Sequence, residues 1–134
     1  MKQRKTFKRY CKTLKLKDEP HVIEAYKKVH ARGNVWPEVT QGMKEAGILD
    51  MEIYIFGNRL FMIMDTLPEF DHDRAMKELA KKPRQVEWEA YVSKFQHTPE
   101  EATAGEKWQL MERVFEMDQE EEYDASDGQL KKCP

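Results

Sequence analysis

Tyr26 and His30 are the two residues whose chemistry and spacing first suggest a reaction. Residues four apart on a helix are neighbours, with Cβ atoms about 6 Å apart, so both side chains could act on one small substrate. Histidine suits proton transfer because its ordinary pKa of about 6.5 lets both protonation states be populated near neutral pH. A Tyr and a His at the edge of a core, with satisfied hydrogen bonds, fit the spacing as well. Spacing alone leaves both interpretations open.

Aromatic side chains are the second feature that could serve a binding site. Flat aromatic faces beside a few polar groups are a common way to hold a sugar ring. The same residues at helical spacing also fit an ordinary core. The candidates are Trp36, Tyr54, Trp88, Tyr91 and Trp108.

Several other chemistries lack their motifs. Asp71-His72-Asp73 holds metal-binding residue types, but neighbours on a capping turn point in different directions, so we expect a helix cap and no metal site. The sequence has no Gly-rich phosphate loop and no G-x-S-x-G elbow. Cys11 and Cys133 form no CxxC pair and have no histidine at motif spacing, which disfavours a disulfide framework or a zinc ribbon. Eight methionines favour a core or a subunit interface.

Length and charge limit the remaining classes. The chain has 134 residues, which favours one domain, and 23 basic against 25 acidic side chains give a net charge of -2. This balance argues against a nucleic-acid partner. No apolar run approaches the roughly 20 residues of a membrane helix, so we expect a soluble, cytoplasmic protein with no membrane partner.

The elements that would position these residues follow from periodicity and turn signals. Asp18-Glu19-Pro20 predicts a helix start with Asp18 as the cap, and Trp36-Pro37 predicts another, because proline is tolerated in the first turn. Gly57-Asn58 fits a two-residue hairpin turn. Strands are expected at 7–14, 48–56, 59–65 and 108–117, and two further helices are expected to start at Asp71 or Asp73 and at Pro83.

This order predicts an α+β fold, a ferredoxin-like β-α-β-β-α-β plait with split helices. Helices would cover one face of the sheet and leave the other bare. The strand at 59–65 is apolar on both sides and needs cover on both faces, so we expect a homodimer. Residues 1–117 would form the single domain, and 118–134 an acidic, poorly ordered tail.

Five short segments in series carry a family resemblance. They are Tyr26-x-x-x-His30, Trp36-Pro37-Glu38, Glu52-Ile53-Tyr54-Ile55, Trp88-x-x-Tyr91 and Glu112-Arg113-Val114-Phe115. Their order and spacing, from about Arg9 to Met117, resemble the L-rhamnose mutarotase family and its relatives that act on L-fucose. The resemblance implies a ferredoxin-like dimeric α/β barrel that interconverts the α and β anomers of a 6-deoxy monosaccharide without a cofactor.

The resemblance also implies roles for individual residues. His30 and Tyr26 would be the catalytic acid/base pair, and Trp36, Tyr54, Trp88 and Tyr91 would bind the sugar. Two departures stand out: the spacing from His30 to Trp36 is longer than in the rhamnose enzymes, and Trp88-Glu89 replaces two adjacent tryptophans. Both bring the chain closer to the relatives that act on L-fucose.

Two alternatives from other classes stay open. The first is a non-catalytic dimeric plait that binds a ligand of a sugar pathway, in which Tyr26 and His30 merely close the pocket. The second is a cofactor-free monooxygenase on the same barrel, which would need a large apolar pocket.

Overall fold

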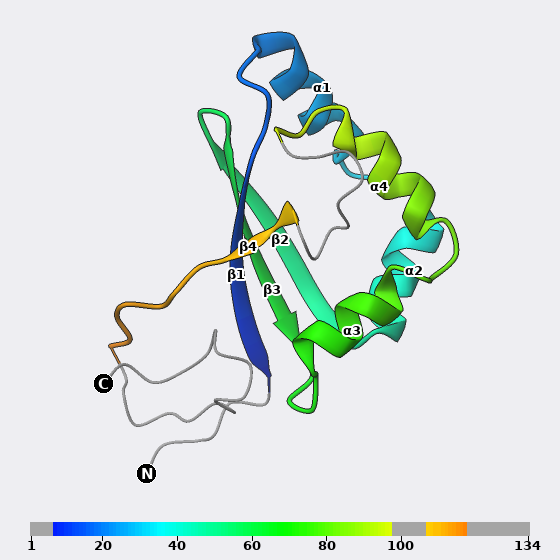
Figure 1. Ribbon diagram of the computed structural model, residues 1–134, viewed down its shortest axis with the longest axis vertical. Coiled ribbons are helices and arrows are strands. Elements are labelled where there is room, and N and C mark those ends of the chain that lie inside the picture. Colours follow the sequence, from blue (N-terminus) through cyan, green and yellow to red (C-terminus); the bar gives the residue numbers. More distant parts are fainter. Residues whose placement is uncertain (1–6, 98–106, 118–134) are drawn as a thin grey trace.

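A four-stranded antiparallel sheet forms the centre of the molecule. The computed structural model describes residues 7–97 and 107–117. Its strands are β1 (Lys8–Lys15), β2 (Ile48–Phe56), β3 (Arg59–Thr66) and β4 (Gln109–Leu110), in the order β2-β3-β1-β4 (Figure 1). The predicted α+β class is confirmed, and the strand order is that of the expected plait.

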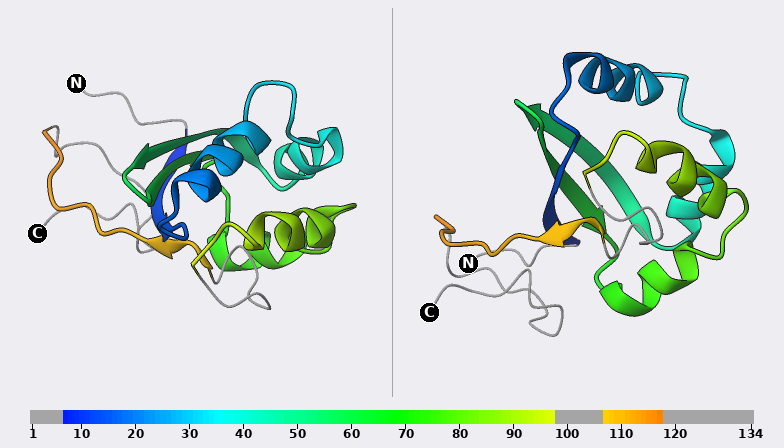
Figure 2. Two further views of the ribbon diagram at one scale, coloured as in Figure 1. Left: turned by 90° about the horizontal axis from the view of Figure 1, so that it is seen from above. Right: turned by 45° about the horizontal axis from the view of Figure 1, so that its top comes forward.

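The described helices lie on one side of this sheet (Figures 1 and 2). Two of them connect β1 to β2 and two connect β3 to β4, so each helical connection is split as predicted. None of the helices in the described part of the chain is long and apolar enough to cross a bilayer. They are α1 (Pro20–Val29), α2 (Pro37–Glu45), α3 (His72–Leu79) and α4 (Gln85–Ser93).

Prolines and caps set the helix starts, with two corrections to the predicted positions. Pro20 is the first residue of α1, so the N-cap is Glu19 and not Asp18, because the residue before a proline is held in extended backbone. Asp71 caps α3 as expected, accepting a hydrogen bond from the Arg74 backbone N–H. The last helix starts two residues after Pro83, since Arg84 adopts a left-handed φ of 63° as its N-cap.

Strand pairing places alternate residues on opposite faces of the sheet. Phe56 pairs with Arg59 across the two-residue turn, where Gly57 has a φ of 63°, which confirms the predicted hairpin. On the helix-covered face the core is continuous. It contains Tyr10, Leu14, Leu60, Met62 and Met64, all of them buried.

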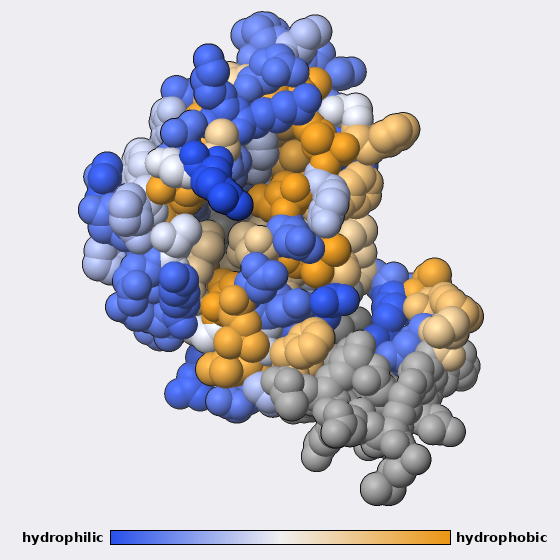
Figure 3. All heavy atoms as spheres, turned by 180° about the vertical axis from the view of Figure 1, so that it is seen from behind, coloured by the Kyte–Doolittle hydropathy of each residue, from blue (hydrophilic) through white to orange (hydrophobic). Residues whose placement is uncertain are grey.

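The opposite face of the sheet, here called the bare face, is covered by no helix of the described residues. Seen from behind, hydrophilic side chains cover much of the helices, and the hydrophobic ones in the middle of the view gather around a hollow on the helix side of the sheet, not on the bare face (Figure 3). Tyr54 and Phe56 on the bare face are 56% and 84% exposed. The residues of this face alternate with covered residues along β1, β2 and β3: apolar Phe56, Phe61 and Ile63 with Cys11, Thr13 and Tyr54 in the middle, and charged Arg9, Lys15, Glu52, Arg59 and Asp65 around them.

The closing strand is much shorter than predicted. It spans only two residues, and after Met111 donates its N–H to the Cys11 carbonyl the chain leaves the sheet (Figure 1). Continuing the register would place Arg113 directly opposite Arg9; in the structure Arg9 pairs with Asp65 of β3 and Arg113 pairs with Glu116 of its own segment. Val114 and Phe115 are consequently exposed. The predicted tail at 118–134 lies outside the described residues.

Candidate active site

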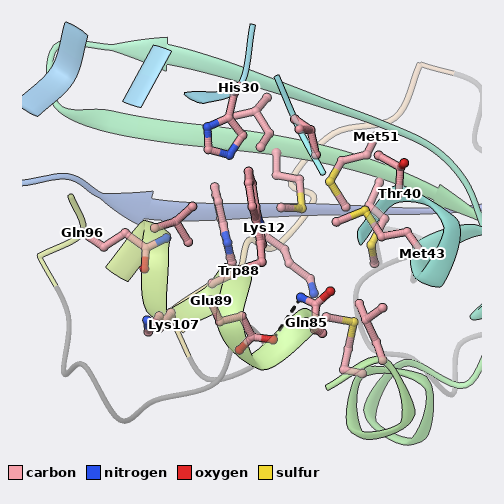
Figure 4. A pocket seen from close by; sticks show the side chains of 18 of the residues that line it. Lys12, His30, Thr40, Met43, Met51, Gln85, Trp88, Glu89, Gln96 and Lys107 are labelled. Carbon is pink, nitrogen blue, oxygen red and sulfur yellow. Dashed lines mark hydrogen bonds between the residues drawn. The ribbon is translucent and has the colours of Figure 1, made fainter. Parts of the chain in front are cut away.

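A cavity of about 330 Å³ lies between the helices and the covered face of the sheet (Figure 4). Its walls come from both halves of the chain, with Tyr26 from α1, His30 from the residue that ends α1, and Trp88 from α4. Three of the six predicted site residues therefore meet at one cavity. Methionines form much of the remaining wall: Met43, Met51, Met62, Met64 and Met76.

The rings of Tyr26 and His30 are stacked, with centroids 4.1 Å apart and planes 28° apart. His30 is the C-cap of α1, and its Nδ1 lies 3.0 Å from the Tyr26 carbonyl oxygen. A carbonyl only accepts, so Nδ1 must carry the hydrogen, and the neutral ring then has its lone pair on Nε2. The helix end thus fixes which nitrogen of His30 can take a proton.

Burial shifts the pKa values of these two residues in opposite directions, and both shifts favour the uncharged form. It lowers the pKa of His30, and the hydrogen bond to the Tyr26 carbonyl opposes that shift. Burial also raises the pKa of Tyr26 far above its ordinary value near 10. At neutral pH the pair therefore consists of a neutral imidazole that can accept a proton and a phenol that keeps its own.

Two aromatic residues contact this pair: Phe95 meets Tyr26 edge-on, with centroids 6.3 Å apart, and Trp88 contacts His30. The Trp88 ring meets His30 edge-on, with centroids 5.4 Å apart and planes 72° apart. Trp36 and Tyr91 stack on each other with ring centroids 5.6 Å apart, and both rings also contact Trp88. Neither of them lines the cavity. The Arg84 guanidinium lies 4.0 Å from the centre of the Trp36 ring, on its face. Trp36 and Tyr91 therefore support Trp88 in this structure and do not reach the cavity.

Tyr54 lies on the bare face, away from the cavity, so its predicted role in sugar binding stays a prediction. Its hydroxyl donates to Glu52 across 3.4 Å at the protein surface. The reason is strand alternation: Met51 and Ile53 line the cavity, so the next residue must point through the opposite side of the sheet. The prediction that Tyr54 binds the sugar finds no support within one chain.

Several polar residues of the cavity were not predicted. Lys12 is only 1% exposed, and burial lowers the pKa of its amine to about 8. Gln85 and Gln96 are also buried at the cavity wall, as is Lys107. A signal for the first was present in the sequence, since Lys12 alternates with Tyr10 and Leu14 and so occupies an inward position of β1.

Asp71-His72-Asp73 acts locally, as a helix start. Asp71 caps α3, and the His72 Nδ1 lies 2.9 Å from an Asp73 carboxylate oxygen. Within residues 7–97 and 107–117, no group of three or more His, Cys, Asp or Glu side chains could hold a metal ion.

Comparisons with known proteins agree on one family. The family model described as L-rhamnose mutarotase matches residues 9–117. An L-fucose mutarotase of Xanthomonas campestris pv. campestris is 34% identical over 110 residues, which cover 82% of this chain and 88% of that protein. A UPF0734 protein of Dictyostelium discoideum is 33% identical over 116 residues, covering 84% and 91%.

A solved structure gives the same fold. The crystal structure of an L-rhamnose mutarotase from Formosa agariphila superposes with a TM-score of 0.61 at 23% identity, and the match covers 83% of this chain and 99% of that one. With a family model matched over most of its length and relatives a third identical, the chain belongs to the L-rhamnose mutarotase family, whose rhamnose and fucose mutarotases are isomerases.

Proposed function

We propose that this protein interconverts the α and β anomers of a 6-deoxy sugar, L-fucose or L-rhamnose, by acid/base catalysis without a cofactor. The observation that carries the proposal is the stacked Tyr26 and His30 pair at the cavity, with the His30 hydrogen held on Nδ1. Family membership supports the reaction class. The 34% identical relative, an L-fucose mutarotase, supports testing L-fucose first.

The reaction needs one group that takes a proton and one that gives a proton. His30 Nε2 removes the proton from the anomeric hydroxyl while the Tyr26 hydroxyl protonates the ring oxygen, so the bond between carbon 1 and the ring oxygen breaks and an aldehyde forms. The imidazolium and the phenolate are then stacked neighbours, and their opposite charges stabilise each other. After rotation about the bond from carbon 1 to carbon 2, the same transfers run in reverse and close the ring on the other face.

The wall of the cavity suits a neutral monosaccharide. Trp88 and the methionines offer apolar surface for the carbon skeleton, and the polar residues offer partners for hydroxyl groups. Glu89 also lines the cavity, directly after Trp88. A carboxylate at this point can accept a hydrogen bond from a hydroxyl of a neutral sugar.

The test is anomer exchange followed by NMR with L-fucose and L-rhamnose in turn. Enzyme should speed exchange of at least one sugar, and His30→Ala should remove most of that acceleration. His21→Ala is the matched control, because His21 lies on the same helix but is exposed to solvent. Unchanged exchange with both sugars, or full activity in His30→Ala, would reject the mechanism, and sugar binding without faster exchange would favour the non-catalytic plait.

We further propose that a second copy of the chain covers the bare face. Phe56 and Tyr54 are exposed next to each other on one face of the sheet, and a contiguous apolar patch of this kind marks an interaction surface. Phe61 and Ile63 extend this surface along β3. Packing two such faces together would give the dimeric barrel that the family resemblance implies.

A further inference from the structure

The cavity has a polar end away from His30. Lys12 of β1 and the pair of Gln85 and Glu89 on α4 all line it. Figure 4 shows the Lys12 side chain running away from His30, toward the side where Gln85 and Glu89 lie. The acid/base pair and these three residues therefore occupy different ends of one cavity.

Lys12 is a buried cation without a protein partner in the described part of the chain. No hydrogen bond or ion pair to its ammonium is made there, and the attraction of Asp73 only partly offsets the cost of burial. Lys8 lies four residues before Lys12 on the same face of β1. It differs from Lys12 because its ammonium donates a hydrogen bond to the Phe70 carbonyl at 2.8 Å. A buried ammonium needs an acceptor, and the cavity is where a bound molecule can supply one.

Gln85 and Glu89 provide acceptors at the same end. The Gln85 Nε2 donates to a Glu89 carboxylate oxygen at 3.0 Å, which fixes the orientation of the amide. Its Oε1 is buried and accepts no hydrogen bond from any residue in the described ranges. This end of the cavity thus combines one strong donor with carboxylate and amide acceptors.

We propose that Lys12 and the Gln85–Glu89 pair bind adjacent hydroxyls at carbons 3 and 4 of the sugar ring and determine which sugars the enzyme accepts. The inference rests on the proposed function, because His30 and Tyr26 must hold carbon 1 and the ring oxygen. The ring edge opposite those two atoms consists of carbons 3 and 4. A hydroxyl both accepts and donates, so a pair of them can take a hydrogen bond from the ammonium and give one to the carboxylate.

This placement has a consequence for sugar choice. L-fucose and L-rhamnose differ in the orientation of the hydroxyls at carbons 2 and 4, and only the second of these lies at the proposed subsite. Sites built to hydrogen-bond a hydroxyl discriminate strongly against a molecule that lacks it, because the buried polar groups are left unpaired.

The experiment compares L-fucose with its 2-deoxy, 3-deoxy and 4-deoxy analogues in the wild type and in Lys12→Met. Binding is measured by tryptophan fluorescence, since Trp88 lines the cavity, and exchange is measured by NMR. Loss of the hydroxyl at carbon 3 or 4 should weaken wild-type binding about 10- to 100-fold, the usual weight of a hydrogen bond to a charged group. Loss of the hydroxyl at carbon 2 should matter far less.

One of the two analogues, 3-deoxy or 4-deoxy, should bind the wild type more weakly than the other. Lys12→Met should bind L-fucose with that same weaker affinity. The variant should also bind L-fucose and that analogue equally well. Glu89→Gln keeps the side-chain size and provides a second test should the first variant fail to fold. Lys44→Met, at an exposed position of α2, is the control. Wild-type discrimination retained in Lys12→Met, or a wild type indifferent to the hydroxyls at carbons 3 and 4, would overturn the inference.

The two proposals fail in different ways. If the wild type binds the sugars without speeding exchange, the proposed function is rejected, and the binding constants still decide the role of Lys12. If the wild type speeds exchange but Lys12→Met discriminates as the wild type does, only the subsite is rejected. If none of the sugars binds or exchanges, both proposals are rejected.

Discussion

The two faces of the sheet use the same three strands for different purposes. The covered face combines a packed core with a cavity whose polar groups are buried, whereas the bare face exposes the aromatic side chains of Tyr54 and Phe56 to solvent. Ile53 lines the cavity and Tyr54, the next residue, lies on the opposite surface. A one-residue step along β2 therefore separates residues that can touch a substrate from residues that can only touch a partner.

The largest effect is expected on the covered face, from Tyr26→Phe. The ring and its stack on His30 remain while the proton donor is lost, so anomer exchange should slow by about a hundredfold or more. The measurement is NMR exchange of L-fucose or L-rhamnose, with circular dichroism to confirm the fold. Exchange within a few-fold of the wild type would show that another group protonates the ring oxygen.

The pH profile of exchange provides a second probe of the covered face. Burial lowers the pKa of His30, so neutral imidazole persists below pH 6.5, and kcat/KM should fall about tenfold per pH unit only under that lowered pKa. Tyr26 stays protonated throughout because its pKa is raised.

Lys12 predicts a second change, on the alkaline side. Its pKa is about 8, so above that pH its ammonium loses a proton and sugar binding should weaken. Glu89 and Lys107 are the other ionisable groups at the cavity. An activity that shows no acidic decline at any pH at which the protein stays folded would contradict the role of His30, and an alkaline decline unchanged in Lys12→Met would contradict the role of Lys12.

On the bare face the strongest probe is Phe61→Asp. A carboxylate in the middle of a subunit interface would be buried without a partner, so the dimer should weaken by at least about 3 kcal/mol. Light scattering after gel filtration should show a dimer for the wild type and a monomer for the variant. Val86→Asp makes a comparable apolar-to-acid change at an exposed position of α4 and should leave the dimer intact. A monomeric wild type would refute the proposed second copy.

Lys12→Met should stabilise the protein even though it weakens sugar binding. The pKa of Lys12 falls from 10.5 to about 8 on folding, so the buried ammonium costs up to about 3 kcal/mol of folding free energy below pH 8. That cost disappears as the pH rises from 8 to above 10.5, because the unfolded chain then also loses the proton. Urea unfolding at pH 7 and at pH 10.5 should show the gain at the first pH only.

Lys8→Met is the control for that measurement. It removes the donor to the Phe70 carbonyl, leaves a buried acceptor unpaired, and should destabilise the protein. If both variants were destabilised equally, Lys12 would be a structural residue like Lys8.

Elements with strong local signals were predictable from sequence. The β2 and β3 hairpin follows from apolar alternation and from a turn whose glycine adopts a positive φ. The closing strand was overestimated, because alternation at 108–117 does not reveal that Arg113 would face Arg9 in the ladder. Pairing between distant segments decides such an edge, and local periodicity carries no information about it.

The candidate site was predictable where helical spacing decides contacts. Tyr26 and His30 are stacked as their i, i+4 positions suggest, and Trp88 reaches them from a distant helix. The sequence analysis did not single out Lys12, because lysines on a strand are usually expected on its solvent-facing side. Its spacing of two residues from Tyr10 nevertheless indicates that Lys12 points inward. Tyr54 was placed in the pocket by motif resemblance, whereas strand phase puts it on the other face.

The smallest effect is expected for Tyr54→Phe, which makes the same chemical change as Tyr26→Phe on the opposite face. Its hydroxyl donates to Glu52 at 3.4 Å in an exposed position, where a hydrogen bond adds little. The ring that would pack in a dimer is kept, so anomer exchange should stay within twofold of the wild type and the variant should have the same oligomeric mass as the wild type. Exchange reduced tenfold or more would show that a partner subunit brings Tyr54 to an active site. The bare face would then contribute to catalysis in the dimer, and the separation of substrate-binding and partner-binding faces would apply only to the isolated chain.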